Sequence, residues 1–142
     1  MNTARRLACA FMVLASSVAV AGPEAILGEW RGTSLCTDRQ LAPACNDEQV
    51  HLIFFQGPDV HVMHLDARKL VGAAYETMFE IDLTYASASD AWVHAFEARG
   101  RKGRWSFRVA GDALDGALVD QATGSPIRKV TASAFKPAAA GR

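Results

Sequence analysis

Short runs of alternating apolar and polar residues dominate this chain and limit what it can fold into. From position 79 to position 85, Phe, Ile, Leu and Tyr occupy every second place, with Glu, Asp and Thr between them. Residues 104–109 repeat the pattern with Trp, Phe and Val. A period of two places all the apolar side chains on one face of a β-strand, whereas an α-helix needs a period of 3.6. The chain is therefore predicted to be all-β.

Runs of this kind are separated by short segments rich in Gly, Pro, Asp and Ser, which favour turns. Because most connections are only a few residues long, consecutive strands are expected to pair antiparallel. Residues 66–74 are expected to form a helical turn or a wide loop. The eight predicted strands are 26–36, 48–55, 60–65, 75–85, 91–98, 103–110, 113–120 and 126–134.

A sheet of short antiparallel strands has two ways to bury its apolar face. It can close into an up-and-down barrel, which removes both exposed edges and leaves room for side chains or one small ligand. It can also fold into a two-sheet sandwich, whose longer crossovers fit short connections less well. We predict the eight-stranded antiparallel up-and-down barrel, with the sandwich as the alternative.

The first 21 residues have the pattern of a secretory signal peptide. Arg5 and Arg6 precede an apolar run over residues 7–20, and Ala-Val-Ala at 19–21 is the small-x-small pattern that signal peptidase cleaves. Cleavage leaves 142 − 21 = 121 residues, and loss of the two arginines changes the formal net charge from zero to 13 − 15 = −2. We therefore expect a periplasmic or secreted protein.

The remaining chain excludes several classes of protein. No second apolar stretch approaches the roughly 18 residues that cross a membrane, so no membrane span is expected. The slightly acidic balance argues against a nucleic-acid binder. The length suits one domain, which we place at residues 22–136, followed by a disordered tail at residues 137–142.

Cys36 and Cys45 are the two cysteines that remain after loss of the signal peptide. In the oxidising compartment reached by exported proteins, two cysteines usually pair. The segment between them contains Pro43 and several polar residues, which is typical of a surface loop. A redox or metal pair normally has Cys-x-x-Cys spacing and further ligands, and neither is present. We interpret the pair as a structural disulfide.

The histidines give little support to a metal site. His61 and His64 are three residues apart, so on one strand they face opposite sides. His94 shares a face with Trp92 and Phe96, which makes it either a hydrogen-bonded histidine in or beside the core or a polar anchor in an interior pocket. We expect no metal and no cofactor.

Patterns typical of catalysis are also missing. The chain has no Gly-x-Ser-x-Gly and no His-Glu-x-x-His motif. Glu80 and Asp82 share a face, but it is the polar face of an amphipathic strand, so we interpret them as solvated. Residues 99–104 carry four cations, which suit either an anionic partner or, as we favour, a solvated turn. We do not expect an enzyme.

The side chains predicted to point into the barrel are bulky, so any cavity is expected to be small. A cavity of about 300 Å³ or more would favour ligand binding. The best candidates for its lining are Trp30, Phe54, Trp92, His94 and Phe96. The wider inward set adds Leu52, Phe79, Ile81, Leu83, Trp105, Phe107 and Leu118.

Gly28-Glu29-Trp30 resembles the Gly-x-Trp opening of the lipocalins and the wider calycin barrels. In those families the tryptophan closes the barrel floor, and an arginine on or just after the last strand packs over its ring. The resemblance implies that Arg128 packs over Trp30 in a cation–π contact of about 0.5–2 kcal/mol. The Thr-Asp-Tyr signature of many lipocalins is absent.

A second resemblance is to a group of small exported bacterial proteins for which we know no established activity. The residues that carry it are Trp30-x-Gly32-x-Ser34-x-Cys36, Cys45, Glu48, Gly111-Asp112-x-Leu114-x-Gly116 and Arg128-Lys129. It supports the compartment and the fold and leaves the function open.

Two functions are compatible with these features. The first is an exported, non-catalytic barrel that binds a small apolar molecule in its interior. The alternative is a module that binds another exported protein, such as a barrel-type periplasmic protease inhibitor acting through the Cys36–Cys45 loop.

Overall fold

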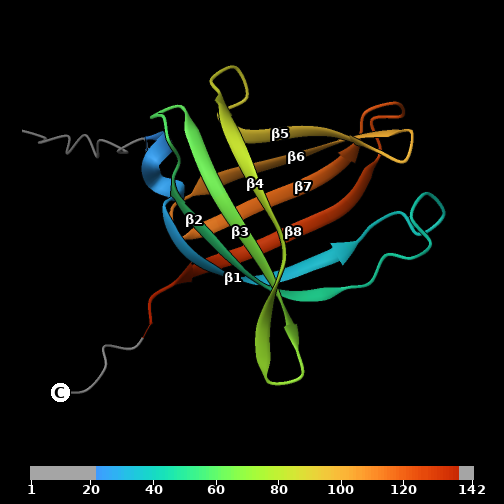
Figure 1. Ribbon diagram of the computed structural model, residues 1–142, viewed down its shortest axis with the longest axis horizontal. Helices are drawn as coiled ribbons and strands as arrows, with labels where there is room; N and C mark the ends of the chain where they lie inside the picture. Colours follow the sequence, from blue (N-terminus) through green and yellow to red (C-terminus); the bar gives the residue numbers. More distant parts are fainter. Residues whose placement is uncertain (1–21, 138–142) are drawn as a thin grey trace, which may run out of the picture.

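The computed structural model describes residues 22–137, which form a closed antiparallel barrel (Figure 1). Each strand pairs with the next along the chain, and β8 pairs with β1 to close the sheet. The prediction of an all-β, eight-stranded up-and-down barrel is confirmed. The elements are the 3-10 turn η1 (Pro23–Ile26) and the strands β1 (Gly28–Cys36), β2 (Glu48–Gln56), β3 (Val62–Val71), β4 (Ala74–Ala86), β5 (Ala91–Ala98), β6 (Arg101–Ala110), β7 (Ala113–Asp120) and β8 (Pro126–Phe135).

The prediction for residues 66–74 is wrong. β3 continues to Val71 and β4 begins at Ala74, so only a short turn joins two long strands, and they form the hairpin at the bottom of Figure 1. A shift of register between Ala67 and Arg68 marks a β-bulge in this pair. The extra residue is Met78 on β4, because Ala67 pairs with Phe79 and Arg68 pairs with Thr77. The end of β3 was missed because residues 66–69 are Asp-Ala-Arg-Lys, which lack a large apolar side chain at every second place.

The predicted signal peptide at residues 1–21 and nearly all of the predicted tail lie outside the described residues. Within the described part, no helix is long and apolar enough to cross a membrane.

One end of the barrel is closed by η1, at the left of Figure 1. The indole Nε1 of Trp30 donates to Ile26 O at 2.8 Å, and that of Trp92 donates to Pro23 O at 2.9 Å. Two tryptophans from opposite sides of the barrel thus hold the turn in place. We call the interior next to η1 the closed half. It is filled by the inward side chains Ile26, Trp30, Phe54, Met63, Leu65, Leu83, Trp92, Phe107 and Leu114, all of which are buried.

The other end of the interior, the open half, faces the β1–β2 connection at the right of Figure 1. Its inward residues on β1, β2 and β3 include Ser34, Val50 and Ala67. β1 and β8 approach each other closely at Gly32, where a Cβ atom would lie 1.9 Å from Thr131 O. Only glycine fits at this point of the wall.

The barrel wall has one weak seam, between β4 and β5. The ladder there contains three residue pairs, from Thr84↔Val93 to Ala86↔Ala91. Beyond it, His94 Nδ1 donates to Asp82 O at 2.8 Å. The side chain of His94 therefore supplies the hydrogen-bond donor for a backbone carbonyl that the ladder no longer pairs. Beyond this point the two strands diverge toward the open half.

Candidate functional site

The open half contains a cavity of about 230 Å³ inside the barrel. One wall consists of Val50, Leu52 and Ala67, from β2 and β3. Val130 of β8 also lines the cavity. The opposite wall consists of apolar side chains from β4 and β6, namely Met78, Phe79, Trp105 and Phe107. At this volume the cavity falls short of the roughly 300 Å³ that was expected to favour ligand binding. It has room only for a molecule smaller than a typical drug-sized ligand.

A stack of three aromatic rings forms the wall beside the β4–β5 seam. Phe79 of β4 stacks on Trp105 of β6 with ring centroids 5.6 Å apart, and Trp105 stacks on Phe107 at 5.7 Å. The first of these contacts links strands that are not neighbours in the sheet. Side chains thus close the wall where backbone hydrogen bonds are missing.

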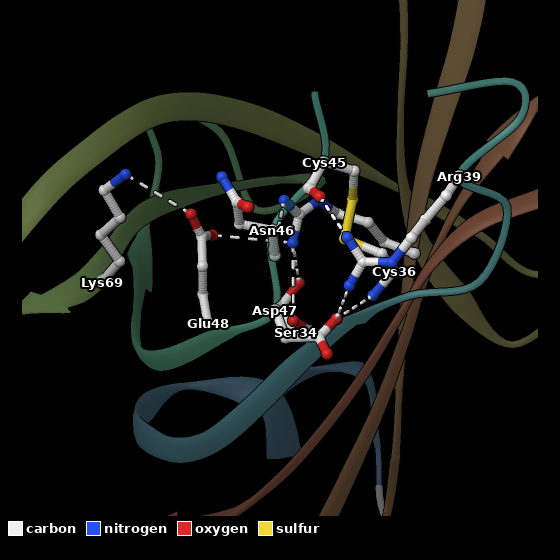
Figure 2. A network of polar contacts seen from close by, with 9 residues as sticks. Ser34, Cys36, Arg39, Cys45, Asn46, Asp47, Glu48 and Lys69 are labelled. Atoms are coloured by element: carbon white, nitrogen blue, oxygen red, sulfur yellow. Dashed lines mark hydrogen bonds and ion pairs between the residues drawn. A yellow bond between two sulfur atoms is a disulfide. The ribbon is translucent and has the colours of Figure 1, made fainter. Parts of the chain in front are cut away.

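Polar side chains gather at the mouth of the cavity, from β1, β2 and β8. Arg128 Nη1 donates to Ser34 Oγ at 2.9 Å, and Arg128 Nη2 donates to Asn46 O at 2.9 Å. Glu48 Oε2 lies 3.6 Å from Arg128 Nη1, while Glu48 Oε1 lies 3.4 Å from Lys69 Nζ. Figure 2 shows Glu48 between Lys69 and the end of β1 that carries Ser34 and Cys36.

This polar cluster is largely withdrawn from solvent. The side chains of Arg128 and Glu48 are each 16% exposed. A charged group withdrawn to this extent interacts more strongly with a nearby ligand than a surface charge does, because less water screens it. The mouth thus adds a few directed polar groups to an apolar chamber, which is the usual composition of a small-molecule site.

The β1–β2 loop between Cys36 and Glu48 lies beside the mouth, where Asn46 O accepts a hydrogen bond from Arg128. The predicted Cys36–Cys45 disulfide is confirmed (Figure 2). Inside the loop, Cys36 N–H donates to Asp47 Oδ1 at 2.8 Å and Arg39 Nη1 donates to Cys45 O at 2.7 Å. The disulfide and these bonds hold the loop in a single compact form.

A second cavity of about 390 Å³ lies between this loop and strands β5 to β8. Arg128 lines both this outer cavity and the inner one, so its guanidinium stands between them. Arg101 of β6 donates to Leu41 O of the loop. The loop is thus attached to the barrel rim through two arginines, Arg101 and Arg128.

The basic segment at residues 99–104 is a tight hairpin turn that continues into β6. Arg99 and Gly100 have φ values of 53° and 74°. Positive φ at both central residues is the mark of a two-residue type I′ turn. Arg99 and Lys102 are exposed, as a solvated turn requires, but the guanidinium of Arg101 donates a hydrogen bond to Leu41 O of the β1–β2 loop.

Of the five residues predicted to line a pocket, three lie in the closed half. Trp30, Phe54 and Trp92 are interior but pack against η1 and the core, away from the cavity. His94 is engaged at the seam, and its ring stacks on that of Phe96 with centroids 6.2 Å apart. Phe96 lines the outer cavity.

The expected packing of Arg128 over Trp30 is wrong. In the β1–β8 ladder Trp30 pairs with Ala134, whereas Arg128 pairs with Cys36 at the other end of β1. Six residues of strand separate the two positions, about 20 Å. The recorded cation–π contacts lie on the outer surface instead, where Arg31 Cζ stands 3.7 Å from the Phe135 ring centroid and 4.9 Å from that of Tyr75.

Ser34, Glu48 and Arg128 are the site residues that sequence reasoning missed. A signal was present, since Ser34 lies four residues from Trp30 and Glu48 lies four from Leu52. Both therefore share the inward face of their strands. A polar residue at an inward position is the informative exception to the pattern. Arg128 lies two residues from the buried Val130 on β8 and so carried the same signal, but the register that brings it to the mouth is not visible in its own strand.

Most other ionisable contacts lie on the outer face of the barrel. His64 Nδ1 lies 2.7 Å from Asp82 Oδ1, and this hydrogen bond raises the pKa of His64 above its ordinary value. Burial by itself would raise the pKa of Asp66, but hydrogen bonds from Arg68 Nε at 2.8 Å and Thr77 Oγ1 at 3.0 Å outweigh it, so the pKa of Asp66 is lowered. These pairs stabilise the outside of β3 and β4 and do not reach the cavity.

Comparison of the chain with protein-family models and with curated proteins finds no match.

Proposed function

We propose that this protein is an exported, non-catalytic barrel that binds a small, largely apolar molecule in the cavity of its open half. The observation that carries the proposal is the contrast between the closed and the open half of the barrel interior. Large side chains fill the closed half, whereas the open half keeps a chamber of about 230 Å³ with polar groups at its mouth. A barrel that served only as a stable scaffold would have no need of such a chamber.

The lining also favours binding over catalysis. Its one hydroxyl, that of Ser34, accepts a hydrogen bond from Arg128. Within the described residues, neither histidine nor cysteine lines the chamber to activate that hydroxyl. Export is supported by the N-terminal sequence pattern, and a disulfide suits an oxidising compartment.

The alternative of a protein-binding module would use the Cys36–Cys45 loop. Two of the carbonyl groups in and beside this loop, Leu41 O and Asn46 O, face inward and accept hydrogen bonds from Arg101 and Arg128. These two carbonyl groups are thus already bonded within the molecule, which leaves fewer groups of the loop free to bind a partner protein.

Ala67→Leu tests the proposal, because Ala67 lines the chamber and a larger side chain there would occupy it. Protein exported by its own host is purified and analysed by native mass spectrometry. We expect a co-purifying small molecule with the natural protein and its loss in Ala67→Leu. Ala95→Leu is the matched control, since Ala95 is exposed on β5.

Thermal unfolding would establish that the Ala67→Leu protein is folded, because overpacking by itself costs about 1–3 kcal/mol. Equal amounts of small molecule in both variants would place the ligand elsewhere. The proposal would also fail if no small molecule, or only a partner protein, accompanied the natural chain.

A further inference from the structure

The mouth of the chamber brings two cations to one carboxylate. Glu48 lies between Arg128 and Lys69, and it is the only acidic residue among residues 22–137 that lines the inner cavity. These three groups together carry a formal charge of +1 at neutral pH. Because Arg128 and Glu48 are largely withdrawn from solvent, this surplus acts on the interior of the chamber more than a surface charge would.

The pairing of Glu48 with Arg128 is loose. Their closest atoms are 3.6 Å apart, beyond the range of a good hydrogen bond. The close contacts of the guanidinium go instead to uncharged oxygens, Ser34 Oγ and Asn46 O, each at 2.9 Å. The strongest hydrogen bonds that arginine makes are charge-assisted, bidentate hydrogen bonds to a carboxylate. Arg128 is thus positioned by neutral acceptors, and its ion pair with Glu48 is longer than a direct hydrogen bond.

The rim of the outer cavity adds further positive charge. Arg101 and Lys102 line it, together with the single carboxylate of Asp120. That carboxylate is buried and accepts hydrogen bonds from the hydroxyl and the backbone N–H of Thr123, at 2.7 and 3.1 Å. Cavities lined by one sign of charge concentrate ligands of the opposite sign. An anion approaching the mouth therefore meets cations both at the rim and inside.

Building on the proposed function, we infer that the ligand is a small apolar carboxylate. Its apolar part occupies the chamber against Phe79 and Trp105, and its carboxylate lies at the mouth beside Arg128. At about 30 Å³ for each water-sized group, a chamber of about 230 Å³ holds roughly eight non-hydrogen atoms. Glu48 repels a doubly charged group more than a singly charged one, which favours a carboxylate over a phosphate ester.

Three probes of similar shape and different charge test the inference: phenylacetate, phenylacetamide and phenethylamine. Their dissociation constants are measured by calorimetry at low ionic strength. We expect phenylacetate to bind about tenfold more tightly than the amide, as one charge-assisted hydrogen bond warrants, and the amine to bind most weakly. An amide that binds as tightly as the acid, or an amine that binds more tightly, would overturn the assignment of charge while leaving the chamber as a binding site. If none of the three binds, the proposed function itself loses its support.

Two variants separate the charge from the shape of the site. Glu48→Gln removes the repelling carboxylate and is expected to tighten phenylacetate binding about threefold, whereas Lys69→Gln is expected to weaken it by a similar factor. Lys69 is about half-exposed, so its replacement leaves the fold intact. Glu97→Gln, on the exposed face of β5, serves as the control for loss of one negative charge. Weaker binding of phenylacetate to Glu48→Gln would contradict the inference.

Discussion

The closed and open halves of the barrel interior are built by the same strands and differ in the size of the side chains on β1, β2 and β3. Both halves lie within one continuous sheet, so the backbone that surrounds them has the same kind of curvature. On three strands the inward residues become smaller or polar toward the open half: Trp30 to Ser34 on β1, Phe54 to Val50 on β2, and Leu65 to Ala67 on β3. On β4 and β6 they remain large, with Phe79 and Trp105 in the open half.

The comparison shows that the chamber needs no special element of structure. A filled interior is a stable core, and the same interior with shorter side chains is a cavity. What the open half adds is a polar mouth beside the disulfide-closed loop. The molecule thus separates stability, supplied by the closed half, from recognition, which we propose for the open half.

Replacement of one leucine in each half would give the largest contrast. Leu65 is fully buried in the closed half, whereas Leu52 is 3% exposed and borders the chamber. We expect Leu65→Ala to lower the free energy of unfolding by about 4–5 kcal/mol, because it opens a new cavity in a packed core. Leu52→Ala only enlarges an existing cavity and should cost about 2–3 kcal/mol. Urea unfolding of the two variants measures the difference, and equal losses would contradict a division into filled and open halves.

Removal of the disulfide would test whether the β1–β2 loop can loosen while the closed half stays folded. Cys36 and Cys45 close a loop of about ten residues, so replacing both by serine should lower the free energy of unfolding by about 2.5–3 kcal/mol on the chain-entropy model. Amide hydrogen exchange should become faster in the β1–β2 loop and stay slow around Phe54. Loss of protection in the closed half at low denaturant would show that the two halves do not behave separately.

The smallest expected effect lies outside both halves, at His64. Its pKa is raised, chiefly by the hydrogen bond to Asp82, so the folded protein binds this proton more tightly than the unfolded chain does. The resulting stabilisation is fully present below the ordinary pKa of 6.5 and is lost as the pH rises through the folded pKa. The stability difference between the natural protein and His64→Gln should therefore shrink from about pH 5 to about pH 8. A difference that grows with pH would reverse the sign of the proposed coupling.

Much of the fold follows from local patterns in the chain. Alternation at positions 79–85 and 104–109, together with turn residues between the runs, is enough to give the number and order of the strands. The end of β3 is the main exception, because residues 66–69, Asp-Ala-Arg-Lys, do not alternate large apolar with polar side chains.

The candidate site was less accessible to such reasoning. Parity along a strand separates inward from outward residues, and it correctly placed Trp30, Phe54 and Trp92 in the interior. It does not say at which height along the barrel axis a side chain lies. That height depends on the register of every strand pair, and it separates the three aromatics from the chamber.

By itself, the sequence determined an all-β chain of eight strands and the pairing of Cys36 with Cys45, and it favoured a barrel over a sandwich. Those features depend on residues close together in the chain or on the only two cysteines in residues 22–137. Only the tertiary structure decided that Arg128 meets Ser34 and Glu48 rather than Trp30. The physical reason is that β1 and β8 lie at opposite ends of the chain, and the register between them is set when the whole barrel closes.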